Sequence, residues 1–312
     1  MIDALIWFIV VELLGLIFLP VAFLLFKNLP DRGYALGKAL SVLLISYVLW
    51  LLSSIHVLPN TRWAIILIVV LLAVCSFFLF KKRWKDIKEY FANNRGVVLA
   101  TEAVFLAAFI LYAVIHSYNP QIVNTEKPMD FAFLNAVMRT DYFPPQDPWL
   151  SGFSINNYYF GHMIMATLTK FTGISTAVSF NLSLALVFAL ASAGSFSIVY
   201  NLVKLCNKGL KAAVGFGIVA AVFLLILGNL EGAWEMGYAH GAGSQAFWGW
   251  VGIENLQSPY HSTSWYPSEW WWWWRASRVI PGGHITEFPF FSFLLGDLHA
   301  HLLALPFVLM SL

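Results

Sequence analysis

Long apolar runs separated by short polar segments set the pattern of this chain from its first residues. A helix needs about 20 predominantly apolar residues to cross the roughly 30 Å of hydrocarbon in a bilayer. We predict spans at Ile2–Phe26, Ala35–His56, Trp63–Phe80, Val97–His116, Ile174–Tyr200, Ala212–Leu230 and Phe288–Leu312. The pattern therefore predicts an all-α polytopic membrane protein with about seven transmembrane helices.

Two long stretches between the spans mix polar and aromatic residues and are predicted to be large outer loops. Within the first, Tyr158–Thr172 is apolar but about 22 Å long as a helix, which favours a half-inserted or surface-lying helix. The predicted organisation is a four-span bundle over 1–116, a first outer loop over 117–173, a two-span hairpin over 174–230, an aromatic-rich outer loop over 231–287 and a last span over 288–312.

Basic residues gather in alternate connections between the spans and set the predicted orientation. Twelve of the 18 lie in three of them: Lys27, Arg32 and Lys38; Lys81, Lys82, Arg83, Lys85, Lys88 and Arg95; Lys204, Lys208 and Lys211. The positive-inside rule places these connections in the cytoplasm. Most acids and all eight histidines then lie on or near the outer face. We expect the chemistry to be extracytoplasmic.

The composition narrows the class of protein. Hydrophobic residues make up 60% of the chain and charged residues 11%, a balance that excludes a soluble domain. No basic arm or recognition motif indicates nucleic acid. Glu12 and Glu102 lie inside predicted spans, where an ionisable group usually faces a partner or a cavity, so both a structural and a functional role stay open.

The first outer loop holds the candidate catalytic residues Asp130, Asp141 and His162. Pro128 suits the first turn of a helix, which places Asp130 where the helix dipole favours a carboxylate. Helical periodicity puts Asp130 and Asp141 on the apolar side of that helix, with Leu134 and Val137. An acid on an apolar face needs a partner, so Asp130 has either a functional role or one of dipole compensation.

The second outer loop and the start of the last span hold candidate ligand-binding residues. Trp272 belongs to a tryptophan run that would serve either as an interfacial belt or as a stacking platform for sugar rings, and Arg275 and Arg278 have the fork geometry that binds phosphate.

The spacing Asp297-x-His299-x-His301 is that of metal ligands when the backbone is extended or bends at Gly296, with Glu287 as a possible fourth ligand for a divalent ion. In a continuous helix only Asp297 and His301 would meet, and interfacial histidines also serve as plain hydrogen-bonding groups.

Several motifs together resemble the YYY-type membrane proteins of archaea and bacteria: Leu29-Pro-Asp-Arg-Gly-Tyr, Met129-Asp130, Asp141-Tyr-Phe-Pro-Pro-Gln-Asp-Pro-Trp-Leu, Asn156-Asn-Tyr-Tyr-Phe-Gly-His162 and Glu287-Phe-Pro-Phe-Phe-Ser with Gly-Asp-Leu-His-Ala-His301. Where that family has three tyrosines, this chain has Asn157-Tyr158-Tyr159. The resemblance implies that the sequence is an N-terminal piece of a longer protein.

More distantly, the layout resembles the GT-C superfamily of glycosyltransferases. That resemblance implies a polyprenyl-phosphate-linked sugar donor, an unidentified acceptor, a catalytic Asp130 and sugar contacts by Tyr158 and Tyr159. This chain departs from that layout in two ways: three predicted spans precede the one that corresponds to the first span of the superfamily, and the paired Asp-Glu or Asp-x-Glu signatures are absent. Two other functions stay open: a transporter or channel lined by Glu12, Glu102 and the outer acids and histidines, and a metal-dependent membrane hydrolase centred on Asp297, His299 and His301.

Overall fold

The computed structural model describes residues 1–312 except 255, 257–263, 268–271 and 281. Its chain divides into two compact units, Met1–Ala221 with Gly296–Leu312, and Val222–Leu295. No β-strand forms among the described residues, so the prediction of an all-α fold is confirmed. The helices are α1 Ile2–Leu25, α2 Gly37–Ser54, α3 Arg62–Asn93, α4 Arg95–Ser117, α5 Lys127–Arg139, α6 Tyr159–Thr172, α7 Thr176–Leu205, α8 Leu210–Val222, η1 Phe223–Leu227, α9 Glu231–Ala239, α10 Gln245–Val251, η2 Arg275–Ser277, α11 Pro289–Leu295 and α12 Ala300–Ser311.

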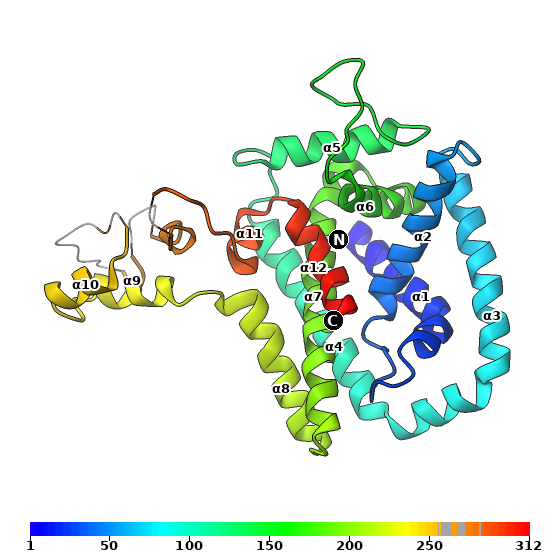
Figure 1. Ribbon diagram of the computed structural model, residues 1–312, viewed down its shortest axis with the longest axis horizontal. Coiled ribbons are helices and arrows are strands. Elements are labelled where there is room, and N and C mark those ends of the chain that lie inside the picture. The colour runs from blue at the N-terminus through cyan, green and yellow to red at the C-terminus, as the bar shows by residue number, and fades with distance from the viewer. Residues whose placement is uncertain (255, 257–263, 268–271, 281) are drawn as a thin grey trace. The chain divides into compact units, whose positions relative to one another are not determined.

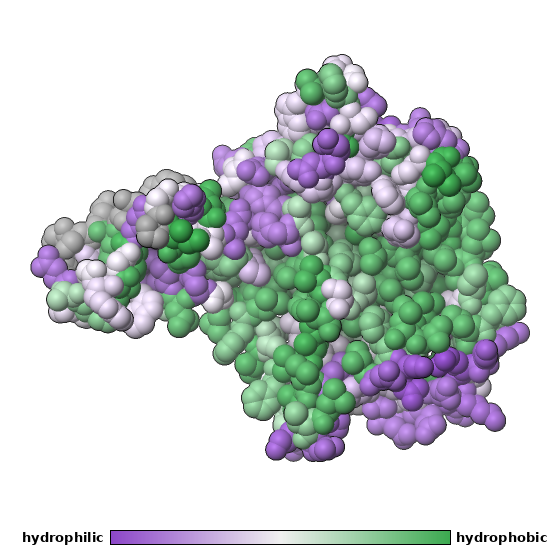
Figure 2. Space-filling model, viewed as in Figure 1, coloured by the Kyte–Doolittle hydropathy of each residue, from purple (hydrophilic) through white to green (hydrophobic). Residues whose placement is uncertain are grey.

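Six helical segments of the described chain are long and apolar enough to cross a membrane. They are α1, α2, α3, α4, α7 and the segment Leu210–Leu227, and they correspond to the first six predicted spans. In the first unit, hydrophobic residues cover the flanks of these helices and hydrophilic residues gather at their ends (Figure 2). The protein is therefore a multi-pass membrane protein.

The seventh predicted span, Phe288–Leu312, is not one helix. Helix α11 ends at Leu295, Gly296 has a left-handed backbone (φ 74°), and α12 begins only at Ala300. Glycine adopts this conformation without a steric penalty, so of the two alternatives left open the chain has the bend at Gly296 and not the continuous helix. Helix α12 has 12 residues and is about 18 Å long, less than the thickness of the hydrocarbon.

Helix α7 forms the centre of the first unit. Almost every side chain between Leu182 and Ser197 is buried, because α4, α5, α6 and α12 pack around it. Small residues allow these close approaches. A Cβ atom on Gly161 of α6 would lie 2.8 Å from Leu303 of α12, and one on Gly194 of α7 would lie 3.2 Å from Leu309.

Asp31 ties the connection between α1 and α2 to α7. Its carboxylate accepts hydrogen bonds from Ser197 Oγ (2.6 Å), Asn201 Nδ2 (2.9 Å) and the Gly33 amide (2.9 Å). Burial raises the pKa of Asp31, while these donors oppose the rise. Buried polar groups are stable only when such partners satisfy them, so Asp31 is a structural residue.

Lys38 pairs with the two acids found inside spans. The prediction placed it in a cytoplasmic connection, but it lies buried in the first turn of α2. Its ammonium lies 2.7 Å from Glu102 of α4 and 3.2 Å from Glu12 of α1. Pairing offsets the cost of placing charge in hydrocarbon, because each ion replaces part of the hydration that the others have lost. This triad fastens α1, α2 and α4 together.

The basic segment after the third span is helical. Helix α3 continues to Asn93, with a kink at Arg83 (φ −111°, ψ 16°) that turns its last part away from the span, as Figure 1 shows. Beyond the kink, Ile87 and Tyr90 are buried against Phe23 and Tyr34, while lysines face outward. Helix α4 starts from this segment, so its other end lies about 34 Å away, at Ser117.

Helices α5 and α6 lie at the end of the first unit opposite the basic segment (Figure 1). Asp130, Leu134 and Val137 form the buried face of α5, as predicted. The same prediction was wrong for Asp141, because α5 ends at Arg139. The Asn60 side chain donates to the carbonyl oxygens of Val137 and Thr140 (both 2.9 Å), and Thr140 is extended.

The first testable prediction concerns orientation. In a variant without Cys75 and Cys206, we expect an impermeant maleimide added to intact cells to label Ser151→Cys but not Lys82→Cys, because the basic segment should face the cytoplasm. Both positions are exposed in the structure, so accessibility within the protein does not bias the comparison. The opposite labelling pattern would reverse the orientation of the chain.

Candidate acid–histidine site

Four charged or titratable side chains meet where α5, α6 and the segment before α12 come together. They are Asp130, His162, Asp297 and His299, here called the acid–histidine cluster. His162 Nε2 lies 3.4 Å from Asp130 Oδ1, and His299 Nε2 lies 3.7 Å from Asp297 Oδ2. One ligand atom each of Asp130, Asp297 and His299 lies within 4.8 Å of the other two. The predicted residues Asp130 and His162 are thus brought together with two residues predicted as metal ligands.

Asp130 is the least satisfied acid of this cluster. Its side chain is 0% exposed, like that of His162, yet neither carboxylate oxygen accepts a hydrogen bond from any described residue. The first turn of α5 gives it a favourable dipole, which is worth at most about 2 kcal/mol in a partly buried setting. That gain is smaller than the several kcal/mol that burial of an ion costs. A binding partner would supply the missing stabilisation.

A strained connection brings two further groups to the cluster. Asn124 (φ 65°) and Thr125 (φ 47°) are consecutive left-handed residues between α4 and α5. Thr125 Oγ1 donates to Asp297 Oδ1 (2.6 Å), and Glu126 Oε2 lies 3.1 Å from His299 Nε2. Strain of this kind costs of order 1–3 kcal/mol per residue and concentrates at functional sites. Sequence reasoning missed Thr125 and Glu126, because no local pattern shows the partners of a loop residue.

The electrostatics of the cluster follow from burial. Burial raises the pKa of Asp297, as does the charge of Asp130, while Thr125, His299 and Lys127 oppose the rise. Burial lowers the pKa of Lys127, and Asp297 opposes that change. Asp297 and Lys127 therefore hold their charges less readily than they would in water.

Aromatic rings border the cluster on the side of the first outer loop. Phe133, one helical turn after Asp130, makes edge contacts with His162, Tyr158 and Trp149, with centroids 5.6–5.9 Å apart. Tyr158 is 39% exposed and Trp149 61% exposed. Asp147 fixes the turn by accepting hydrogen bonds from the amides of Trp149 and Leu150. Phe133 thus connects the cluster to two partly exposed rings that are open to a ligand.

The other predicted residues of the first loop have different surroundings. Tyr159, predicted to contact substrate, accepts a hydrogen bond from Trp50 Nε1 (2.8 Å) and stacks on Phe143. Asp141 is exposed and lines a separate cavity of about 720 Å³ with Asn135 and Arg139. The structure does not bring Asp141 to the acid–histidine cluster.

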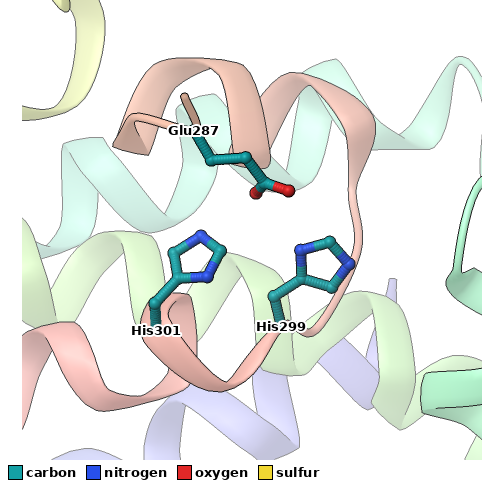
Figure 3. Close-up of side chains that lie close together, drawn as sticks. All are labelled: Glu287, His299 and His301. Atoms are coloured by element: carbon teal, nitrogen blue, oxygen red, sulfur yellow. The ribbon is translucent and has the colours of Figure 1, made fainter. Parts of the chain in front are cut away.

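His301 lies beside His299. Figure 3 shows the two side chains next to each other, with ring centroids 5.5 Å apart. His299 is extended and precedes the first turn of α12, so the two rings are not on one continuous helix. Glu287, also labelled in Figure 3, belongs to the second unit, where it accepts a hydrogen bond from Ser292 (2.8 Å). The predicted set of Asp297, His299, His301 and Glu287 stays a prediction.

The second unit holds the predicted phosphate-binding arginines. Arg275 is buried and lies 2.8 Å from Glu235, while Arg278 packs over the Trp274 ring at 5.4 Å. Both arginines line a cavity of about 450 Å³ that also includes Glu231 and Trp234. Trp272 is half-buried, and the tryptophans at 270 and 271 lie outside the described residues.

Fold and site together define a class: a helical, multi-pass membrane protein with a buried acid–histidine cluster at one end of its bundle. The sequence profile of one family, described as uncharacterized membrane protein (DUF2298), matches residues 44–312. The chain belongs to this family. No curated protein and no solved structure matches the chain.

The missing hydrogen bonds of Asp130 lead to a stability prediction. We expect Asp130→Asn to raise the free energy of unfolding by about 1 kcal/mol or more in a buffer with a chelator, because it removes a buried charge that accepts no hydrogen bond from the described residues. Asp31→Asn should lower it by about 1–3 kcal/mol, because Asp31 accepts three hydrogen bonds. Denaturant unfolding in detergent measures both. Destabilisation by both variants would mean that Asp130 has a structural role.

A pH dependence is predicted for the second unit. Burial raises the pKa of Glu231 from 4.5 to about 9, with further contributions from Glu235, while Arg275 opposes the rise. Between these two pKa values the folded state binds a proton that the unfolded state releases. The contribution of Glu231 to the free energy of unfolding is therefore most favourable below about pH 4.5 and is lost as the pH rises toward about 9. Glu231→Gln should flatten this dependence. Tryptophan fluorescence during unfolding measures it, and equal pH slopes in both proteins would contradict the prediction.

Proposed function

We propose that this protein is a membrane transferase that moves a sugar from a polyprenyl-phosphate donor to an acceptor hydroxyl at the extracytoplasmic face. The observation that carries the proposal is Asp130, a fully buried carboxylate that accepts no hydrogen bond from the described residues and lies against His162, next to partly exposed aromatic rings. Enzymes hold acids in this way when the substrate completes the site.

The chemistry assigns a role to each part of the site. The acceptor oxygen attacks the anomeric carbon, its proton passes to the Asp130–His162 pair, and the bond from the anomeric carbon to the phosphate oxygen breaks. A positioned acid or base of this kind contributes typically 10²–10⁴-fold to the rate. The lipid phosphate departs as an anion. Lys127 is a nearby cation whose charge acts on the cluster, and it would stabilise that anion.

Aromatic side chains support a sugar as the transferred group. Tyr158 and Trp149 stand around Phe133 and leave ring surface exposed, and an apolar sugar face packs against such rings. Tyr158 has a strained backbone (φ 21°), and its pKa is raised by partial burial and by the charges of Asp130 and Glu126. We also propose that the donor is bound by Trp272 through its ring and by Arg275 and Arg278 through its phosphate.

The position of the cluster supports an extracytoplasmic, lipid-linked reaction. It lies near the end of α4 that is about 34 Å from the basic segment, close to the thickness of a bilayer. The apolar flanks of the spans would accommodate the polyprenyl chain. A transporter is less well supported, because Glu12 and Glu102 are paired with Lys38 and hold the helices together.

The fourth prediction tests catalysis. In proteoliposomes supplied with polyprenyl-phosphate sugars and a cell-envelope extract as the acceptor source, the wild type should release polyprenyl phosphate. Asp130→Asn should reduce the rate by at least about 100-fold, because it removes the proton-accepting charge. Asp86→Asn, an exposed acid in the basic segment, should retain the wild-type rate.

Sugar that appears only as the free monosaccharide would identify a hydrolase instead. An unchanged rate in Asp130→Asn would remove the proposal.

A further inference from the structure

We infer that Asp130, Asp297 and His299 bind one divalent transition-metal ion at the acid–histidine cluster. This inference deepens the proposed function by naming the cofactor class of the same site. It differs from the ligand set that spacing alone indicated, because the structure adds Asp130, from a different part of the chain, to Asp297 and His299.

The geometry of the three donors fits a single ion. One ligand atom of each residue lies within 4.8 Å of the other two. Carboxylate oxygen and imidazole nitrogen bind zinc at about 2.0–2.2 Å, so two ligands of one ion lie at most about 4.4 Å apart. Shifts of under about 1 Å in these side chains would bring all three to the ion. The three residues come from α5 and from the segment before α12, so only the folded chain unites them.

Charge balance supplies the independent observation. Asp130 is 0% exposed and Asp297 is 1% exposed, and no described lysine or arginine nitrogen lies within 4.0 Å of either carboxylate. Both oxygens of Asp130 and Oδ2 of Asp297 accept no hydrogen bond from the described residues. Two buried carboxylates this close repel each other strongly unless a cation lies between them. Asp31 is buried to the same degree, but it accepts hydrogen bonds from Ser197 and Asn201 and so requires no cation.

Neighbouring groups are arranged as supports for metal ligands. Thr125 Oγ1 donates to Oδ1 of Asp297 and leaves Oδ2 for an ion. His162 lies beside Asp130. Such contacts orient ligands and adjust their basicity, and their loss typically costs 10–100-fold in metal affinity. Glu126 Oε2 lies 3.1 Å from His299 Nε2, the same nitrogen that faces Asp297 Oδ2, so Glu126 is placed as a further ligand rather than as a support. The strained residues Asn124 and Thr125 hold this arrangement in place.

The donor set selects the class of ion. An imidazole nitrogen with two carboxylates suits Mn²⁺ or Zn²⁺, whereas Ca²⁺ prefers six to eight oxygen ligands and Mg²⁺ prefers carboxylate, phosphate and water. When bound, the ion would supply positive charge for the phosphate of a lipid-linked donor. This chain's residues would hold the ion, and the aromatic rings beside the cluster would leave its open side to the substrate.

Metal binding can be measured without any enzymatic assay. Purified protein is stripped with EDTA, then titrated with Zn²⁺ and separately with Mn²⁺, and bound metal is measured by elemental analysis after desalting. We expect about one equivalent in the wild type, and an affinity lower by more than about tenfold in Asp130→Asn and in Asp297→Asn. Asp141→Asn, an exposed acid of the same loop, should bind like the wild type. Denaturant unfolding of each stripped variant shows that it is folded.

The outcomes separate the metal site from the transferase. Equal binding in wild type and Asp130→Asn, or no binding in folded wild type, overturns the metal site. Binding that is lost in variants of His301 or Glu287 but kept in Asp130→Asn also overturns it, in favour of the set predicted from spacing. Transfer that persists in stripped protein overturns the role of the ion as a cofactor and leaves the transferase. Metal binding without transfer leaves the site and removes the transferase.

Discussion

The cost of burying charge where water is scarce governs how this protein is built. In the first unit the buried ions fall into two groups. Lys38 pairs with Glu12 and Glu102, and Asp31 has its hydrogen-bond donors, so both connect helices that would otherwise share only apolar contacts. Asp130 and Asp297 lie together, and among the described residues both oxygens of Asp130 and Oδ2 of Asp297 accept no hydrogen bond. The first group holds the bundle together, and the second defines where a ligand would act.

Local sequence patterns were sufficient for most of the fold because hydropathy acts over one helix at a time, although the seventh predicted span is broken at Gly296. The first six spans, the helix from Tyr159 and the buried face of Asp130, Leu134 and Val137 all follow from runs and periodicity within a single segment. Predictions were wrong where a distant residue decides the outcome. Asn60 caps α5 before Asp141 is reached, and the two glutamates hold Lys38 inside the bundle rather than in a connection.

The candidate site could be predicted only in pieces. Asp130 and Asp297 were each identified from local features, but 167 positions separate them, and nothing in either segment indicates that they meet. Thr125, Glu126 and Phe133 carry no signal of their own, since a loop threonine or a helical phenylalanine is ordinary in any protein. Their roles arise from what folding places opposite them.

The contact between Gly161 and Leu303 has a consequence for how the site is maintained. Gly161 immediately precedes His162 on α6, and Leu303 lies on α12, the helix that follows His299. The contact between Gly161 and the Leu303 side chain therefore sets the distance between the helices that carry the two histidines. The geometry of the acid–histidine cluster would then depend on an apolar position. A methyl group added at Gly161 would push α6 and α12 apart and move the charged side chains without replacing any of them.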